Sequence, residues 1–316
     1  MTEEVFDTII IGGGVAGLGA AVYCGRFQMK TLILTEKKGG TIILTKDIGN
    51  YPGFKNITGM ELAKKLEEHV KEYGVEIQTG KVTKVESDKV EGNCFKVFVG
   101  EKSFLTKTII FATGTEWKKL KVPGEEEFTA KGVHYCALCD GAIYKDKVIG
   151  VVGGSDSAAK EALLLTEYGK KVFIIYRKEE IRAEPINYER VKENKKIEII
   201  NNTNVVEIKG NKTVTGIVLD KPYNGSKEFK LDALFVEIGH IPLSNLAKDL
   251  GLDLNDKHEI KVDRDSKTNI NGVFAAGDVV DTRFKQAITG VGEGVQAAFS
   301  AYQYINNNKL TSAPSN

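Results

Sequence analysis

The chain has 316 residues, which is long enough for about two domains. Its 44 basic and 43 acidic residues leave a net charge of +1, so there is no electrostatic reason to expect a nucleic acid or an anionic membrane as a partner. Four cysteines in a chain of this length do not make the disulfide framework that is typical of small secreted proteins.

An uncharged run near the start of the chain predicts buried secondary structure. Residues 8–25 could span a membrane by length, but glycines interrupt the run and acidic residues precede it. A signal peptide would begin with basic residues instead, so we expect a cytoplasmic protein. The pattern predicts a strand over residues 6–11, a glycine turn and a helix from about Val15. A second strand is expected to end near Thr35.

The glycine turn matches the G-x-G-x-x-G pattern with Gly12, Gly14 and Gly17. In that pattern the first glycine makes the turn, the second lets the backbone approach a pyrophosphate, and the third lets helix and strand pack closely. The helix start offers free N–H groups and a partial positive charge to phosphates. Glu36 follows at roughly the 20-residue distance from which a carboxylate binds ribose hydroxyls. Any α/β protein could use such a turn, but the whole order predicts dinucleotide binding.

The same pattern returns in the middle of the chain. A strand is expected over residues 147–152, Gly153 opens the turn, and Ala158 takes the third small position. The next strand is expected over residues 172–176. Ser155 stands where the second glycine would be, and its side chain crowds the approach of a phosphate. The sequence therefore predicts two related nucleotide-binding units.

A basic segment follows the second of these strands. Arg177, Lys178 and Arg182 would suit the 2′-phosphate of NADPH, because guanidinium groups pair with phosphate in a fixed fork. The alternative is a solvated charged turn that Glu179 and Glu180 neutralise. This segment favours NADPH over NADH.

Elements far apart in the sequence are expected to complete the first unit. Residues 108–115 form an apolar strand that ends on Gly114, and a short strand leads into Gly277 and Asp278. A final helix is expected from about Lys285. Its predicted buried stripe consists of Ala287, Val291, Val295, Ala298, Phe299, Tyr302 and Ile305. The expected fold class is α/β, with two Rossmann-like dinucleotide-binding domains, the second inserted into the first.

The only closely paired cysteines, Cys136 and Cys139, leave three kinds of chemistry open. A zinc site needs four ligands, and Cys24, Cys94 and four scattered histidines lack suitable spacing. A structural disulfide would close too short a loop to constrain much. A redox pair fits best, because C-x-x-C lowers the pKa of one thiol and makes thiolate available. Asp140 could then shuttle protons, or it could cap a helix.

The motifs taken together resemble a known family. They run in the order G-x-G-x-x-G, NYPGF, ATGT, CALCDG, YRKEEIRAE, EIGHIP, GVFAAGDV and QAITGVGEG. Over nearly its whole length the chain resembles the low-molecular-weight thioredoxin reductases, which are flavin-dependent disulfide reductases. The resemblance implies an FAD domain over residues 1–116 and 244–316, and an inserted NADPH domain over residues 117–243 that carries C-x-x-C. It implies electron flow from NADPH through FAD and the cysteines to a thioredoxin-like or glutaredoxin-like protein, and a homodimer.

The resemblance also implies roles for single residues. Cys136 would exchange with the partner protein, Cys139 would face the flavin, and Asp140 would donate and accept protons. The residues implied for FAD are Gly12, Gly14, Gly17 and Glu36 at its ADP half, and Gly40, Asn50, Gly114, Gly277, Asp278, Gln286 and Ala287. Those implied for NADPH are Gly153, Ser155, Ala158, Arg177, Lys178 and Arg182. No metal site is expected.

The chain departs from the family pattern in three segments. The family usually has H-R-R-x-x-x-R where this chain has Tyr176, Arg177, Lys178 and Arg182. It usually has glycine in place of Ser155 and often glutamine in place of Thr41. These departures leave open a reductase of the same fold that uses ferredoxin, NADH or another donor. A flavin oxidoreductase without cysteines and a redox sensor are further alternatives. Because the dithiol must meet both the flavin and a protein, we expect the inserted domain to rotate.

Overall fold

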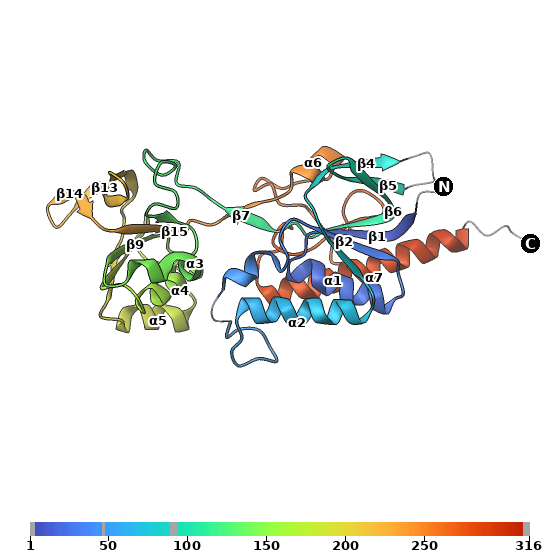
Figure 1. Cartoon of the computed structure of the whole chain (residues 1–316), viewed down its shortest axis with the longest axis horizontal. Coiled ribbons are helices and arrows are strands. Elements are labelled where there is room, and N and C mark those ends of the chain that lie inside the picture. Colours follow the sequence, from blue (N-terminus) through green and yellow to red (C-terminus); the bar gives the residue numbers. More distant parts are fainter. Residues whose placement is uncertain (1–3, 46–47, 89–93, 312–316) are drawn as a thin grey trace, which may run out of the picture. The chain divides into compact units, whose positions relative to one another are not determined.

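The computed structural model describes residues 4–45, 48–88 and 94–311, and the chain forms two compact units (Figure 1). The first unit comprises Met1–Glu116 and Pro242–Asn316, and the inserted unit comprises Trp117–Ile241. The chain therefore passes between the units twice, through the paired strands β7 (Thr115–Trp117) and β16 (His240–Pro242). The predicted fold class, with one Rossmann-like unit inserted into another, is confirmed.

The first unit is built on one sheet with the strand order β3-β2-β1-β6-β5-β4, and β17 also pairs with β6. Strands β1, β2, β3, β6 and β17 run parallel, whereas β5 is antiparallel to β4 and β6. The strands are β1 (Val5–Ile11), β2 (Thr31–Thr35), β3 (Glu76–Thr79), β4 (Val82–Asp88), β5 (Cys94–Val99), β6 (Lys102–Phe111) and β17 (Val273–Ala275). The helices are α1 (Val15–Arg26), η1 (Gly40–Leu44), α2 (Gly59–Glu72), α6 (Asn245–Leu250) and α7 (Ala287–Thr311).

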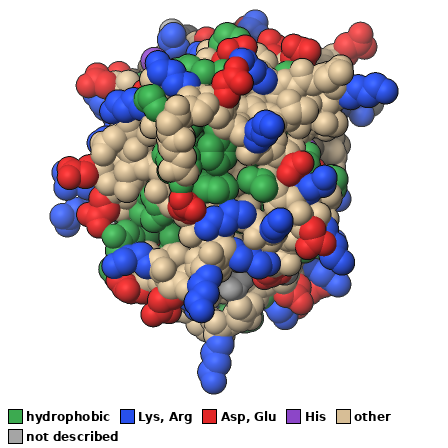
Figure 2. Space-filling view, turned by 90° about the vertical axis from the view of Figure 1, so that its left-hand side faces the viewer, with side chains coloured by type: hydrophobic (Ala, Val, Ile, Leu, Met, Phe, Trp, Pro, Cys, Tyr) green, Lys and Arg blue, Asp and Glu red, His purple; other side chains and the backbone are tan. Residues whose placement is uncertain are grey.

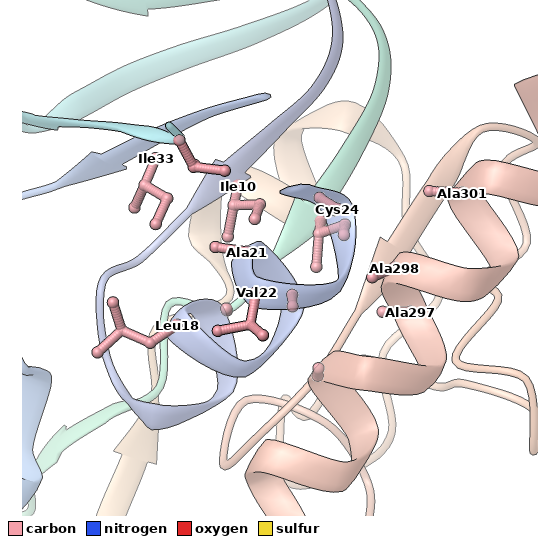
Figure 3. Packing of buried hydrophobic residues seen from close by; sticks show 14 of the residues in the cluster. Ile10, Leu18, Ala21, Val22, Cys24, Ile33, Ala297, Ala298 and Ala301 are labelled. Carbon is pink, nitrogen blue, oxygen red and sulfur yellow. The ribbon is translucent and has the colours of Figure 1, made fainter. Parts of the chain in front are cut away.

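Helices α1 and α7 pack through small residues, as Figure 3 shows. A Cβ atom placed at Gly294 would lie 2.1 Å from the carbonyl oxygen of Ala16, so the two helix backbones are close. Ala297, Ala298 and Ala301 of α7 are fully buried in the same core. The same buried core contains Leu18 and Val22 of α1 together with Ile10 and Ile33 of the sheet.

This close packing changes the predicted stripe of the last helix. Ala298 and Ile305 are buried as expected, but Phe299 and Tyr302 are 41% and 36% exposed. Their aromatic rings pack on Phe27, with centroid distances of 6.2 and 4.6 Å. The prediction for Phe299 and Tyr302 is wrong because the helix buries its smallest side chains, which allow a near neighbour. The helix also begins two residues after Lys285, at Ala287.

The inserted unit has a five-stranded parallel sheet with the order β11-β10-β9-β15-β8 and an antiparallel sheet with the order β12-β13-β14. Its strands are β8 (Val133–His134), β9 (Val148–Val152), β10 (Lys171–Ile175), β11 (Ile197–Ile200), β12 (Val205–Gly210), β13 (Val214–Tyr223), β14 (Ser226–Lys230) and β15 (Ala233–Val236). Its helices are α3 (Ala137–Asp140), η2 (Gly141–Tyr144), α4 (Asp156–Leu165) and α5 (Pro185–Glu193).

One end of the inserted unit carries partly buried aromatic rings. Phe173, Tyr223 and Phe229 contact one another edge to face, with centroids 4.8 to 6.4 Å apart. Figure 2 looks onto the end at which Figure 1 places β13 and β14, and it shows apolar surface surrounded by side chains of both charges.

Among the described residues, no helix has the length and apolar character needed to cross a membrane.

Candidate active site

The first glycine turn follows β1 and has the backbone geometry that its pattern predicts. Gly12 has a φ of +118°, and a Cβ atom there would lie 2.1 Å from the carbonyl oxygen of Ala112. At Gly17 a Cβ atom would lie 2.0 Å from the carbonyl oxygen of Gly12. At Gly14 the nearest atom would be the Cα of Gly40 at 3.8 Å. The turn and the tight packing therefore require glycine at Gly12 and Gly17, whereas Gly14 leaves the backbone open.

Loops from distant parts of the first unit meet at this turn. Parallel strands bring their carboxyl ends to one edge of a sheet, which is where such folds bind ligands. At this edge, a Cβ atom at Gly277 would lie 2.8 Å from Cβ of Ala16, and one at Gly40 would lie 2.8 Å from Cα of Gly14. The predicted residues Gly12, Gly14, Gly40 and Gly277 thus line one small cradle without side chains.

A second contact joins two predicted residues that are 236 positions apart. The side-chain amide of Asn50 donates to Oε1 of Gln286 at 2.9 Å. Gln286 directly precedes α7, and its backbone N–H donates to Oγ1 of Thr289 at 3.0 Å. The predicted helix start at Ala287 is therefore held beside the loop that contains Asn50.

Three other predicted residues lie at the ends of strands. Glu36 is exposed at the end of β2, with its carboxylate 3.7 Å from Nζ of Lys81. Gly114 has a φ of +68°, and its carbonyl accepts the backbone N–H of Leu243 at 3.0 Å. Asp278 is half-buried directly after Gly277. Glu36 and Asp278 both lie at the edge where the cradle opens, because they follow β2 and β17.

The loop after β17 is held by two residues that the sequence pattern does not single out. The carboxylate of Glu293 accepts the backbone N–H of Gly277 at 2.8 Å and the hydroxyl of Thr282 at 2.5 Å. Burial raises the pKa of Glu293. Nζ of Lys285 donates to the carbonyl of Asp278 at 2.7 Å. The only signal in the sequence is that both charges occur in an otherwise uncharged stretch, residues 285–297.

The second glycine turn follows β9 in the inserted unit. Gly153 has a φ of +154°, and a Cβ atom there would lie 2.2 Å from the carbonyl oxygen of Glu237 and 3.0 Å from Cβ of Ala158. Ser155 is exposed at the N-cap of α4. The small residue at Ala158 is thus needed for close packing, as the pattern predicts.

The basic segment folds back onto this turn. The backbone N–H of Arg182 donates to the carbonyl of Gly154 at 2.6 Å, which brings Arg182 beside Ser155. The exposed side chains of Arg177, Lys178 and Arg182 form no ion pair with any residue that the structure describes. Glu180 instead accepts the hydroxyl of Tyr188 at 2.6 Å. The structure therefore leaves these cations available and does not show the neutralisation by neighbouring glutamates that the alternative interpretation assumed.

Cys136 and Cys139 form a disulfide at the start of α3, with their Cα atoms 5.4 Å apart. Cys136 caps this helix, because its sulfur accepts the backbone N–H of Cys139 at 3.1 Å. Cys136 is buried and Cys139 is exposed. Cys24 is fully buried within α1, as predicted for a packing residue, and burial raises its pKa to about 12. Within residues 4–45, 48–88 and 94–311, no cluster of side chains suits a metal ion.

Asp140 stands at the N-cap position of η2, but its side chain contacts a histidine. Its Oδ2 lies 2.9 Å from Nδ1 of His134, and its side chain makes no capping hydrogen bond to the following helix η2. The side-chain hydrogen bond that the capping interpretation requires is therefore not formed. In the sequence, His134 is one of four scattered histidines, although it lies only six positions before Asp140. The contact depends on the turn through α3, which residue spacing alone does not reveal.

A pair of carboxyl groups, the half-buried Glu161 of α4 and the buried Glu237 after β15, contacts the start of α3 through Glu161. Oε2 of Glu161 accepts the backbone N–H of Ala137 at 3.0 Å, one residue from Cys136. Burial raises the pKa of Glu161 to about 7, and burial together with the charge of Glu161 raises the pKa of Glu237 to about 9. Oε1 of Glu237 is buried without a hydrogen-bond partner among the described residues. The pair therefore retains a proton at neutral pH.

Two Rossmann-like units and a C-x-x-C disulfide define a nucleotide-dependent disulfide reductase. The family described as pyridine nucleotide-disulphide oxidoreductase matches residues 6–294. Thioredoxin reductase of Bacillus subtilis is 39% identical to this chain over 307 residues, which cover 96% of both chains. Thioredoxin reductase of Listeria monocytogenes is 39% identical over 311 residues, which cover 97% of this chain and 96% of the relative. The crystal structure of Lactococcus lactis thioredoxin reductase has a TM-score of 0.91 and 40% identity, covering 96% of this chain and 99% of that one.

A second solved structure agrees with these relatives. Thioredoxin reductase of T. acidophilum has a TM-score of 0.88 and 36% identity, covering 95% of this chain and 99% of that one. The chain therefore belongs to the pyridine nucleotide-disulphide oxidoreductases and, among them, to the low-molecular-weight thioredoxin reductases. The resemblance and the enzyme class that the motifs predict are confirmed.

Proposed function

We propose that the chain is an FAD-dependent thioredoxin-disulfide reductase that takes electrons from NADPH and delivers them through Cys136 and Cys139 to a thioredoxin-like protein. The observation that carries this proposal is the disulfide at the start of α3, directly followed by a carboxylate. It occurs in a chain related to thioredoxin reductases over nearly its whole length.

The first unit is the proposed FAD site. The cradle of Gly12, Gly14, Gly40 and Gly277 fits a pyrophosphate, because no side chain fills it and the start of α1 supplies free N–H groups. Glu36 would hold ribose hydroxyls, and the start of α7 would face the flavin pyrimidine. When bound, FAD supplies the two-electron chemistry that links a nicotinamide to a disulfide.

The inserted unit is the proposed NADPH site. Arg177, Lys178 and Arg182 are exposed, and the last of them is fixed beside the glycine turn. Arginine pairs with phosphate through two parallel hydrogen bonds, so this segment suits a 2′-phosphate. NADH lacks that phosphate and would leave these cations without a partner.

The cysteines and Asp140 would carry out the disulfide exchange. A thiolate at Cys136 attacks the partner disulfide, a new S–S bond forms, and one partner sulfur leaves with the bonding electrons. The sulfur of Cys139 then attacks Cys136 and releases the second partner thiolate. The protons of the two thiols end on the two partner sulfurs, and Asp140 transfers them.

The inserted unit must present the dithiol in two settings, one for electron uptake and one for the partner protein. The two crossings at β7 and β16 are short, which suits a hinge. We therefore propose a rotation of the inserted unit about these strands. A cross-link between the units should abolish turnover, and full activity of the cross-linked protein would contradict the rotation. We further expect a cytoplasmic homodimer, which sedimentation of the FAD-loaded protein can test.

An anaerobic titration tests the proposed donor. The FAD-loaded protein is titrated in turn with NADPH, NADH and a reduced ferredoxin, and bleaching of the flavin absorbance is followed. We expect bleaching with NADPH at lower concentration than with NADH; bleaching by ferredoxin alone would favour the alternative donor.

Cys139→Ser separates a reductase from a redox sensor. A reductase with this substitution loses reduction of thioredoxin but keeps electron uptake into the flavin. Unchanged thioredoxin reduction by the variant would contradict the proposed role of the disulfide.

A further inference from the structure

His134 connects the carboxylate beside the redox pair to a tyrosine hydroxyl. The residue ends β8 and is 5% exposed. Its Nδ1 lies 2.9 Å from Oδ2 of Asp140, and its Nε2 lies 2.8 Å from the hydroxyl oxygen of Tyr144. The ring stacks on Phe235 with a centroid distance of 5.3 Å and an interplanar angle of 27°. Both nitrogens therefore have a partner, and the ring plane is fixed.

This geometry suits the transfer of a proton. A neutral imidazole donates from one nitrogen and accepts at the other, so it can take up a proton on one side and release one on the other. Tyr144 is half-buried in η2, and burial together with the negative charge of Asp140 raises its pKa. The phenol therefore stays protonated, and its oxygen can accept the N–H of Nε2.

We propose that Asp140, His134 and Tyr144 form a proton relay between the redox dithiol and solvent, with His134 as the positioning residue that controls proton exchange at Asp140. The relay rests on the proposed function, because it takes Asp140 as the group that exchanges protons with the thiols. His134 touches no reacting sulfur and acts only through Asp140.

The relay accounts for the protons that the disulfide exchange releases and takes up. When the sulfur of Cys139 attacks Cys136, its proton moves to Asp140, a new S–S bond forms and the bond from Cys136 to the partner breaks. The proton on Asp140 passes to Nδ1 of His134 while the proton on Nε2 passes to the oxygen of Tyr144. The phenolic proton of Tyr144 then moves to solvent, which supplies a proton to the departing partner thiolate. The order reverses when the disulfide is reduced.

Other charged groups surround the ring but do not enter the relay. The titratable and charged groups on the neighbouring elements are Asp140 of α3, Tyr144 of η2, and Asp156, Lys160 and Glu161 of α4. Glu237 directly follows β15, and Asp232 and Lys147 directly precede β15 and β9. Of these, only Asp140 and Tyr144 contact the imidazole within the described residues.

The test uses FAD-loaded protein whose dithiol has been reduced with dithiothreitol and freed of reductant. Its oxidation by the small disulfide 5,5′-dithiobis(2-nitrobenzoate) is followed from pH 5.5 to 9, which needs neither donor nor protein partner. His134→Asn keeps a polar side chain beside Asp140 but cannot relay a proton. Tyr144→Phe keeps the ring and removes the outer hydroxyl. The matched controls are His69→Asn on α2 and Tyr223→Phe on β13.

We expect His134→Asn to slow oxidation about tenfold near neutral pH, since a positioned acid–base group contributes roughly 100-fold or more when it acts directly. The pH profile of the variant should differ from that of the wild type. Its rate should also rise with the concentration of imidazole buffer at constant pH, because the buffer replaces the missing relay. Tyr144→Phe should show the same buffer dependence with a smaller loss, and it carries the test if His134→Asn does not fold. Both controls should behave like the wild type.

Two outcomes separate the relay from the function on which it rests. The relay would be overturned if His134→Asn and Tyr144→Phe kept the pH profile of the wild type and their rates did not depend on buffer concentration. This holds even if the rates are reduced, because His134 would then only support packing. If Asp140→Asn oxidises at the wild-type rate, the proposed role of Asp140 itself fails. Loss of rate in Asp140→Asn alone leaves the proposed function intact and removes only the relay.

Discussion

Replacing Glu237 by glutamine should change how the stability of the inserted unit depends on pH. In the folded protein the pKa of Glu237 is about 9, because the group is buried and faces the charge of Glu161. In the unfolded chain the pKa of a glutamate is about 4.3. Between these values the folded state holds a proton that the unfolded state has lost. Stability from this group is therefore full below the unfolded pKa and is lost as pH rises through the folded pKa.

The size of the effect follows from proton linkage. One extra bound proton changes the free energy of unfolding by about 1.4 kcal/mol per pH unit, which gives about 4 kcal/mol between pH 5 and 8. Water entry and local relaxation reduce the cost of a buried charge, so we expect about half of this, roughly 2 kcal/mol. Glu237→Gln removes the titrating group. The variant should therefore gain about that much stability relative to the wild type as pH rises from 5 to 8.

Calorimetric unfolding of the FAD-loaded protein from pH 5 to 9 measures this difference, and flavin fluorescence marks the transition of the first unit. The control is Glu193→Gln, which removes an exposed carboxylate from α5 of the same inserted unit. We expect the control to follow the wild type at every pH. If the wild type and Glu237→Gln lose stability in parallel over the whole range, the carboxyl group is not protonated in the folded state and the reasoning is refuted.

Three further predictions concern the nucleotide sites and the exchange chemistry. In steady-state assays, Arg182→Ala should raise the KM for NADPH about tenfold and leave kcat and the KM for NADH unchanged, because a charge-assisted hydrogen bond contributes roughly 1.5–3 kcal/mol. Equal effects on both nucleotides would contradict a 2′-phosphate contact. Gly17→Ala should lower flavin content and thermal stability, because its Cβ would lie 2.0 Å from a carbonyl oxygen. The control is Gly292→Ala in α7, where a Cβ atom has no neighbour within 4 Å; it should be neutral or stabilise the protein by up to about 1 kcal/mol. Cys139→Ser should trap a mixed disulfide between Cys136 and the partner protein, detectable by mass spectrometry, and trapping by Cys136→Ser instead would reverse the assigned roles.

The parts of the fold that sequence predicts well depend on local geometry. Gly12 and Gly17 are required by a turn and a helix packing contact that lie within one strand–turn–helix unit. The strands predicted over residues 6–11, 147–152 and 172–176, and α1, agree with the structure for the same reason. The strand predicted over residues 108–115 ends early, at Phe111. The stripe of α7 was harder to predict, because the preference for Ala297 over Phe299 on the buried face depends on the nearness of α1. The spacing of hydrophobic residues along a helix does not show how closely a neighbouring helix packs.

The candidate site divides in the same way. The cysteines and Asp140 could be found because they are adjacent and carry distinctive chemistry. His134 and the pair of Glu161 and Glu237 could not, since each acquires its meaning from a contact between different elements. An acid directly after the apolar run that forms β15 is an unusual signal, but its partner on α4 lies 76 positions earlier in the chain, and only folding brings the two together.

The contact of Gly294 with Ala16 has a consequence for the order of events during biosynthesis. A ribosome releases the β1 turn early, but the helix that closes over it leaves the exit tunnel only after the whole insertion has been translated. The intervening segment has a self-contained core and can acquire its native structure first. The outer unit must wait with its apolar sheet incomplete, which makes the nascent chain dependent on protection from aggregation during that interval.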